Sequence, residues 1–235
     1  MTPLLYALLS ALANVAGALA VAGHARRAMR ILDALIAIAA GFMISVGLTQ
    51  LVPEAIARGG PSAPVVMLAA YLAVHLTQHT LTSHFHFGEE THRVSAAVSL
   101  SALAGLLMHT FVDGVAIAAG FEVGTELGVL AFVGVVLHKL PEGLAIASLF
   151  LAAGQSPRVA VAAAGALGLA TLAGVAVTEF IAPLAAHGLP LAAGVTLYVA
   201  ASNLVPEFQA RRGWRLAFCF FGGCALFGLV SWALR

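Results

Sequence analysis

Residues 126–151 read ELGVLAFVGVVLHKLPEGLAIASLFL, an apolar run that encloses His138, Lys139 and Glu142. A helix of about 20 apolar residues, rising 1.5 Å per residue, spans the hydrocarbon core of a bilayer. Ionisable side chains are costly inside such a helix, and there they mark an ion pathway or a paired site. This stretch therefore predicts a membrane-spanning helix that carries polar chemistry near its centre.

The rest of the chain shares this apolar character. Its 235 residues are 61% hydrophobic and 9% charged, with a mean hydropathy of +1.01, whereas soluble domains are about 25% charged. The net charge is +1, so the basic stripe of a nucleic-acid-binding protein is missing. Cys219 and Cys224 sit in an apolar run, which does not suit a disulfide framework. The composition predicts an all-α polytopic membrane protein with residues 1–235 in a single transmembrane domain.

Eight segments are long and apolar enough to cross the bilayer. They are residues 3–22, 31–56, 64–82, 95–120, 126–151, 157–186, 190–208 and 216–234. If the N-terminus lies outside, eight arginines fall in the cytoplasmic connections, and only Arg58 and Arg235 lie on the outer side. This positive-inside bias predicts a multi-pass protein of the cytoplasmic membrane with both termini extracytoplasmic.

Two of these segments contain an internal repeat. Residues 41–54 read GFMISVGLTQLVPE, and residues 194–207 read GVTLYVAASNLVPE. The two copies enter the membrane in opposite directions in this topology, which predicts an inverted repeat of helices 1–3 and 6–8, a recurring plan of secondary transporters. The alternative is that LVPE is a common way for an apolar helix to end. Gln50 and Asn203 occupy matched places in the copies, where they line a pathway or bridge helices as amides.

A second repeat carries the candidate metal ligands. The fourth segment contains His109-Thr-Phe-Val-Asp113-Gly, and the fifth contains His138-Lys-Leu-Pro-Glu142-Gly. Residues four apart share one face of a helix, so each helix offers an imidazole and a carboxylate together. Two such faces opposed across a short gap would hold a divalent metal such as zinc, iron or manganese.

Two further ionisable residues belong with this site. Glu179 lies in an apolar run without a basic neighbour in its own helix, so it needs a partner, and we expect the metal site to provide it. Lys139 is the only lysine and follows His138 directly. We hypothesise that its ammonium stands where a second metal would otherwise bind; the alternative is that it snorkels to the surface. In this view Asp113, Glu142 and Glu179 carry three negative charges, which Lys139 and one divalent cation would neutralise.

Small residues and a proline shape the same two helices. Pro141 frees a backbone carbonyl one turn earlier, which widens the passage or presents oxygen to a moving ion. Gly114 and Gly143 each follow an acid and permit close approach of a neighbouring helix.

Several other histidines could handle metal. His75 and His79 share a helix face, and His84, His86 and His92 crowd the loop that follows. On the cytoplasmic side this loop could receive released metal or sense its concentration. The alternative is a solvated loop with incidental histidines.

The two histidine motifs resemble the ZIP (Zrt-/Irt-like protein) family of divalent metal transporters, whose fourth helix carries H-N-x-x-[DE]-G and whose fifth carries a related histidine, proline and glutamate motif. Glu179 and Pro183 resemble an element of the family's sixth helix, although Phe-Ile-Ala separates them here. Residues 197–207 are similar to its seventh helix. The resemblance covers the whole chain and implies a 3+2+3 bundle of eight helices, a single transport domain with its site between helices 4 and 5.

The chain departs from the family pattern at two positions. Thr110 and Lys139 stand where many members have an asparagine and an acid that bind a second metal. The resemblance therefore implies one metal at His109, Asp113, His138 and Glu142. It also implies uptake of Zn²⁺ into the cytoplasm, with Fe²⁺, Mn²⁺ and Cd²⁺ as other cargoes. Lipid and divalent metal ions are the expected partners, nucleic acid is not, and a homodimer is compatible with the sequence.

Two other classes of protein stay open. An intramembrane metal-dependent hydrolase could use the same ligands to activate water, although the chain has no HExxH motif. A metal-dependent structural or sensor protein would bind tightly without carrying metal across the membrane. The resemblance favours a transporter that is not an enzyme.

Overall fold

The protein is a bundle of helices. The structure is a computed structural model that describes residues 2–78, 95–209 and 214–235, without the side chains of residues 24–30, 182, 183 and 185. No strand occurs in these described ranges. Within the described part of the chain, seven helical stretches are long and apolar enough to cross a membrane: Pro3–Gly23, Ile31–Leu76, Ala96–Val123, Thr125–Ala152, Pro157–Phe180, Ala186–Gln209 and Trp214–Ala233. The predicted all-α polytopic class is confirmed.

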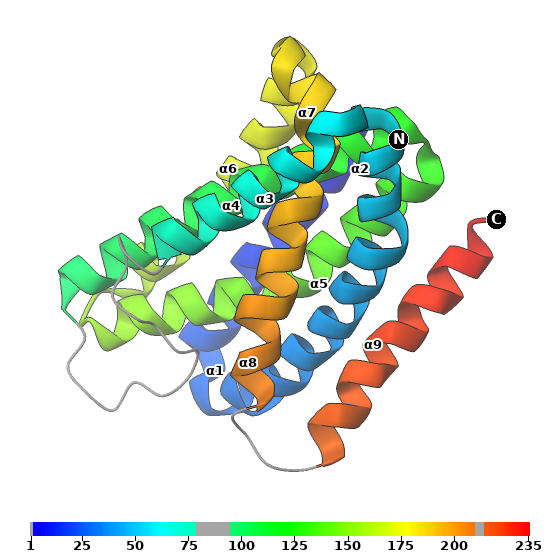
Figure 1. Ribbon diagram of the computed structural model, residues 1–235. Helices are drawn as coiled ribbons and strands as arrows, with labels where there is room; N and C mark the ends of the chain where they lie inside the picture. The colour runs from blue at the N-terminus through cyan, green and yellow to red at the C-terminus, as the bar shows by residue number, and fades with distance from the viewer. Residues whose placement is uncertain (1, 79–94, 210–213) are drawn as a thin grey trace.

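Helix α1 (Pro3–Val46) contains two apolar halves, Pro3–Gly23 and the part that begins at Ile31. The backbone of Asn14 packs on Gly143, while Phe42 and Val46 pack beside Gly134. In a straight helix Asn14 and Phe42 would be about 42 Å apart, whereas Gly134 and Gly143 are only about 14 Å apart along their own helix. The two halves of α1 must therefore run side by side along the same neighbour, as Figure 1 shows.

The stretch Ile31–Leu76 combines two of the predicted segments, 31–56 and 64–82. Beyond α1 it comprises η1 (Gly47–Leu51), α2 (Val52–Gly59), η2 (Gly60–Ser62) and α3 (Ala63–Leu76). Gly60 has φ of 60°, a conformation that glycine adopts without steric cost, and it ends α2. The stretch holds 46 residues, enough for two crossings of about 20 residues each. Residues 79–82 of the predicted segment lie outside the described residues.

The two central helices are α4 (Ala96–Val123) and α5 (Thr125–Ala152). Ser95 caps α4 by accepting a hydrogen bond from the backbone N–H of Val98, and Gly124 alone separates the two helices. The predicted segments 95–120 and 126–151 are thus confirmed to within a few residues. Both helices are rich in buried residues near their centres, so they form the middle of the bundle (Figure 1).

Reciprocal glycine contacts join the central helices to their neighbours. A Cβ on Gly143 of α5 would clash with the backbone of Asn14, and one on Gly17 of α1 would clash with the backbone of Leu140. In the same way, a Cβ on Gly114 of α4 would clash with the backbone of α6 (Pro157–Phe180), and one on Gly174 of α6 would clash with the backbone of α4. The predicted close approach at Gly114 and Gly143 is confirmed, because in both places only glycine lets the backbones touch.

The same device joins α1 to α9 (Trp214–Ala233), the last helix. Gly41 faces the backbone of Phe220, and Gly223 faces the backbone of Ile38. We call these three reciprocal pairs, α1–α5, α4–α6 and α1–α9, the glycine seams.

The break between the sixth and seventh predicted segments is wrong in position. The segments 157–186 and 190–208 place the turn at residues 187–189, but α6 ends at Phe180 and α7 (Ala182–Leu197) begins two residues later. Ile181 between them is extended, with φ −108° and ψ 101°. The proline near the start of α7 lies where a missing N–H costs no hydrogen bond, so it marks the beginning of a helix, whereas Pro190 lies inside α7.

Both copies of the LVPE repeat contain a π-helical turn. η1 ends at Leu51 and η4 (Tyr198–Leu204) ends at Leu204, and each is followed by a short α-helix, α2 or α8 (Val205–Gln209). The N–H of Val52 bonds to the carbonyl of Gly47, and the N–H of the matched Val205 bonds to that of Ala200. A proline with no N–H follows each valine. The two copies therefore share the same uncommon backbone as well as the same sequence.

Candidate metal centre

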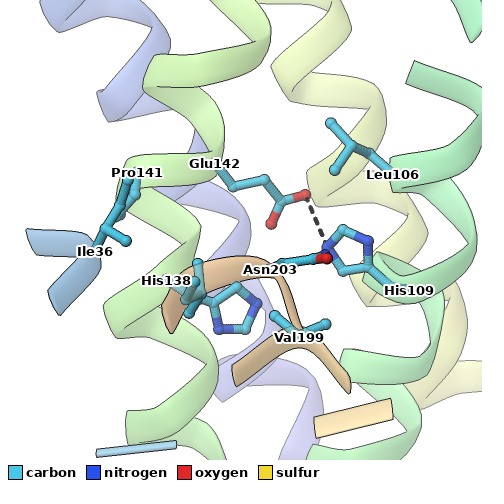
Figure 2. A pocket seen from close by; sticks show the side chains of 9 residues that line it. Ile36, Leu106, His109, His138, Pro141, Glu142, Val199 and Asn203 are labelled. Carbon is cyan, nitrogen blue, oxygen red and sulfur yellow. Dashed lines mark ion pairs between the residues drawn. The ribbon is translucent and has the colours of Figure 1, made fainter. Parts of the chain in front are cut away.

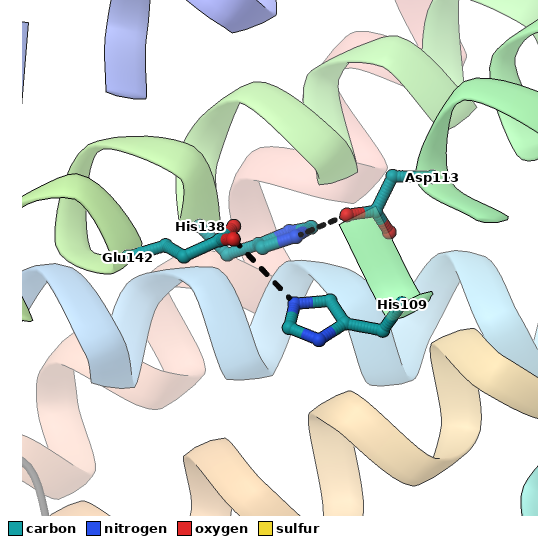
Figure 3. Close-up of side chains that lie close together, drawn as sticks. All are labelled: His109, Asp113, His138 and Glu142. Carbon is teal, nitrogen blue, oxygen red and sulfur yellow. Dashed lines mark hydrogen bonds and ion pairs between the residues drawn. The ribbon is translucent and has the colours of Figure 1, made fainter. Parts of the chain in front are cut away.

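Four predicted residues meet between α4 and α5. His109, Asp113, His138 and Glu142 each offer one ligand atom, and these atoms all lie within 4.8 Å of one another. All four side chains are buried. Figure 3 shows them converging from two helices. The i, i+4 spacing in each motif placed the side chains on one face, and the packing of α4 against α5 brings the two faces together.

Each imidazole faces the carboxylate of the other helix. Nε2 of His138 lies 3.1 Å from Oδ2 of Asp113, and Nε2 of His109 lies 3.7 Å from Oε1 of Glu142. Nitrogen and oxygen ligands of this kind suit zinc and similar divalent metals. The arrangement can hold a single ion with two ligands from each helix.

The backbone orients the ring of His138. Its Nδ1 lies 3.0 Å from the carbonyl oxygen of Gly134. Because a carbonyl only accepts hydrogen bonds, Nδ1 must carry a proton, and Nε2 is the nitrogen that can ligate a metal. Nε2 faces a second acceptor in Asp113, so both hydrogen bonds form only in the imidazolium. A metal ion held between Nε2 and Oδ2 would replace that second proton.

Lys139 is part of the same cluster. Its Nζ lies 2.7 Å from Oδ2 of Asp113 and 2.6 Å from Oε2 of Glu142, and its side chain is 0% exposed. The alternative that Lys139 snorkels to the surface is therefore wrong. With neutral histidines, the two carboxylates and the ammonium leave the cluster with one net negative charge.

Thr110 contacts the site as well. Its hydroxyl lies 2.8 Å from Oε1 of Glu142 and 2.7 Å from the carbonyl oxygen of Leu106, and the residue is fully buried. The two positions that depart from the family pattern, Thr110 and Lys139, thus both engage Glu142. Each oxygen of that carboxylate already has a partner in this chain.

Two cavities follow one another along α5, and three of the four clustered residues line the first. On α5 the first is lined by His138, Pro141 and Glu142, and the second by residues about two turns earlier. The other lining residues of the first cavity are Ile36, Leu106, His109, Val199, Asn203 and Leu204 (Figure 2). The second is lined by Met43, Val46, Leu51, Ala116, Ala131, Gly134, Val135 and Thr196. The first cavity reaches the candidate ligands, and the second is almost entirely apolar.

Glu179 does not join the cluster. It lies in the last turn of α6, its side chain is exposed, and it is not among the four grouped residues. Although Glu179 follows a long apolar run, α6 ends one residue later, so the side chain emerges from the bundle. The three negative charges expected around the metal are reduced to two, and a divalent ion beside Lys139 would leave one net positive charge.

The remaining predicted residues fall in different places. Asn203 lines the first cavity, whereas Gln50 is half-buried on η1 and lines neither cavity. His75 on α3 lies against Tyr198, with ring centroids 5.9 Å apart. The other predicted histidines lie outside the described residues: His79, His84, His86 and His92.

Gln78 is a site residue that the sequence prediction missed. Its Oε1 accepts a hydrogen bond of 2.7 Å from Nδ2 of Asn203, and its Nε2 lies 3.4 Å from Nδ1 of His109. The sequence signal that could have pointed to Gln78 was an amide side chain three residues after His75 in an apolar segment. Its partner on α4 could not be read from that spacing.

The helices and this buried cluster define a multi-pass membrane protein with a polar site between its central helices. Residues 73–231 match the family model described as ZIP zinc transporter. That range contains all four clustered residues and more than half of the chain. The chain belongs to the ZIP family, whose members transport divalent metals and are not enzymes. A comparison with curated proteins finds no match.

Proposed function

We propose that this protein carries Zn²⁺ into the cytoplasm through a mononuclear site formed by His109, Asp113, His138 and Glu142. The observation that carries the proposal is the grouping of four buried ligand atoms within 4.8 Å of one another. Nitrogen and oxygen ligands do not discriminate strongly among divalent metals, so Fe²⁺, Mn²⁺ and Cd²⁺ are the alternative cargoes.

A single ion fits the charge of the site better than two. Lys139 donates to both carboxylates, and Thr110 donates to Glu142. A second divalent ion would have to displace the buried ammonium from between them. Glu179 is left out of the proposed ligand set because it is exposed.

The proposed topology is a single transport domain of eight crossings in a 3+2+3 arrangement. It counts Ile31–Leu76 as two crossings, for which its 46 residues suffice. An even number of crossings puts both termini on one side, and the two chain ends lie toward the same end of the bundle in Figure 1. The distribution of arginines supports the cytoplasmic membrane with both termini outside.

In this topology the first cavity opens the site toward the cytoplasm. On α5, residues 138–142 lie nearer the cytoplasmic end than residues 131–135 of the second cavity. The apolar second cavity would then separate the site from the outside. Alternating access would open one cavity as the other closes around a site near the midplane.

The test is metal uptake into proteoliposomes that contain the purified chain. We expect Zn²⁺ entry in the wild type and none in Asp113→Ala or His138→Ala, each checked for membrane insertion and monodisperse elution. Glu179→Ala is the matched control and should retain uptake. Wild-type rates in both ligand variants would remove this site from the proposal.

The same preparation separates the other classes of protein. Zinc entry without hydrolysis of peptide substrates supports transport. Hydrolysis without zinc entry would favour the intramembrane hydrolase, and tight zinc binding without entry would favour a sensor or structural protein.

A further inference from the structure

Two side-chain amides connect His109 to the π-helical element η4. Asn203 of η4 donates from Nδ2 to Oε1 of Gln78 over 2.7 Å, and Nε2 of Gln78 lies 3.4 Å from Nδ1 of His109. Asn203 also lines the first cavity beside His109 (Figure 2). A ligand of the proposed zinc site thus shares a hydrogen-bonded chain with Asn203, 94 residues away in sequence.

The donors and acceptors in this hydrogen-bonded chain of two amides follow a fixed order from Asn203 to His109. Each amide has one accepting oxygen and one donating NH₂ group. Because Gln78 receives the hydrogen of Asn203 on its oxygen, it turns its NH₂ group toward His109. Nδ1 of His109 is then an acceptor, and the proton of the neutral ring sits on Nε2. That Nε2–H points toward Oε1 of Glu142, 3.7 Å away.

The two histidines of the site therefore hold their protons on different nitrogens. Gly134 keeps a proton on Nδ1 of His138, which suits metal binding through Nε2. Gln78 keeps Nδ1 of His109 free of a proton, so the proton lies on Nε2. This tautomer does not suit metal binding through Nε2. For His109 to bind metal through Nε2, its proton must be on Nδ1, and Gln78 must then present its oxygen to the ring.

We propose that the Gln78–Asn203 amide pair is a positioning element that sets the tautomer of His109 and reverses its direction when metal binds. This inference rests on the proposed function, because it takes His109 as a ligand. A second contact to η4, between Tyr71 Oη and Ser202 Oγ at 2.6 Å, comes from α3, which ends two residues before Gln78. Site occupancy would thereby be coupled to the contact between α3 and η4.

Histidine ¹⁵N NMR of the purified protein measures the tautomer of His109, because the two ring nitrogens give different signals with and without a proton. We expect His109 to carry its proton on Nε2 without metal and on Nδ1 with Zn²⁺. In Asn203→Asp the carboxylate can only accept, so Gln78 must give it the NH₂ group and turn its oxygen to His109. The Nδ1–H tautomer should then appear without metal. Gln78→Glu should give the same result by offering only oxygens to the ring.

Ser202→Asp is the matched control, because it adds the same charge one residue away and can accept from Tyr71 instead of Gln78. It should keep the wild-type tautomer. Since partners that orient metal ligands alter metal affinity about 10–100-fold, we expect Asn203→Asp to bind Zn²⁺ about tenfold more tightly than Ser202→Asp. An unchanged tautomer in both Asn203→Asp and Gln78→Glu would overturn the inference, and so would the same change in Ser202→Asp.

The two proposals fail separately. If the metal-free tautomer follows the amides but the wild type shows no zinc uptake, the proposed function fails and the amide pair stands. If uptake depends on Asp113 and His138 but the tautomer ignores the amides, the inference fails and the transport site stands.

Discussion

Nζ of Lys139 lies 2.6 Å from Oε2 of Glu142, one turn further along the same helix, and 2.7 Å from Oδ2 of Asp113 on the neighbouring helix. The ammonium therefore bridges the two carboxylates that we propose as metal ligands. Burying these charges is costly, and their mutual attraction offsets the cost only while all partners remain. Lys139 stabilises the carboxylate pair, and at the proposed site it would compete with the incoming ion for its oxygens.

Replacing Lys139 by glutamine should separate these two effects. Removing one partner of a buried ion pair costs about 3–5 kcal/mol, so Lys139→Gln should lower the stability of the metal-free protein by that order. It should also bind Zn²⁺ more tightly, because the competing cation is gone. Thermal unfolding with and without Zn²⁺, together with calorimetric titration in detergent, measures both. Arg58→Gln is the control: it breaks an exposed ion pair with Glu54, and such pairs contribute about 0–1 kcal/mol.

Replacing Lys139 by aspartate should change the number of bound ions. An acid at this position supplies a ligand where the ammonium now stands, so we expect the stoichiometry to rise from one Zn²⁺ per chain to two. Elemental analysis of the purified protein measures it, and Lys139→Gln should remain at one. A folded Lys139→Asp variant with a single ion would show that Lys139 does not replace a second metal.

Glu179→Gln should leave the zinc affinity within about twofold of the wild type. The side chain is exposed at the end of α6 and is not grouped with the four clustered residues. Titration of the purified variant tests this expectation, with Glu142→Gln as the comparison that should lose affinity. Equal losses in the two variants would restore Glu179 to the ligand set.

Gly143→Ala should destabilise the protein, because a Cβ there meets the backbone of Asn14. Overpacking of this kind typically costs about 1–3 kcal/mol. Gly165→Ala is the control, since a Cβ at Gly165 has nothing within 4 Å. Chemical denaturation in the same detergent compares the two. A loss in Gly165→Ala as large as in Gly143→Ala would mean that the close approach of α1 and α5 is not the cause.

Local spacing made the metal cluster predictable from the sequence. His109 and Asp113 share a helical face because they are four residues apart, and the same holds for His138 and Glu142. The close approach at Gly114 and Gly143, which each directly follow an acid, was predicted too, whereas their partners Gly174 and Gly17 were not. These features depend on a few neighbouring residues, which a sequence displays directly.

Features that depend on tertiary packing were harder to predict. Hydropathy suggested burial for Glu179, but the helix ends one residue later and the side chain is exposed. Two prolines could have started α7, and the sequence prediction chose Pro190. The contact between Gln78 and Asn203 joins residues 125 positions apart, and no local sequence pattern predicts it.

The glycine seams place backbone against backbone one residue after Asp113 and one residue after Glu142. The spacing of each ligand-bearing helix from its outer neighbour, α4 from α6 and α5 from α1, is therefore set by main-chain atoms, which are the same in every amino acid. The chemistry of the centre and the scaffold around it are separable: the four ligands could be exchanged for a set with another metal preference while the frame that carries them stays as it is.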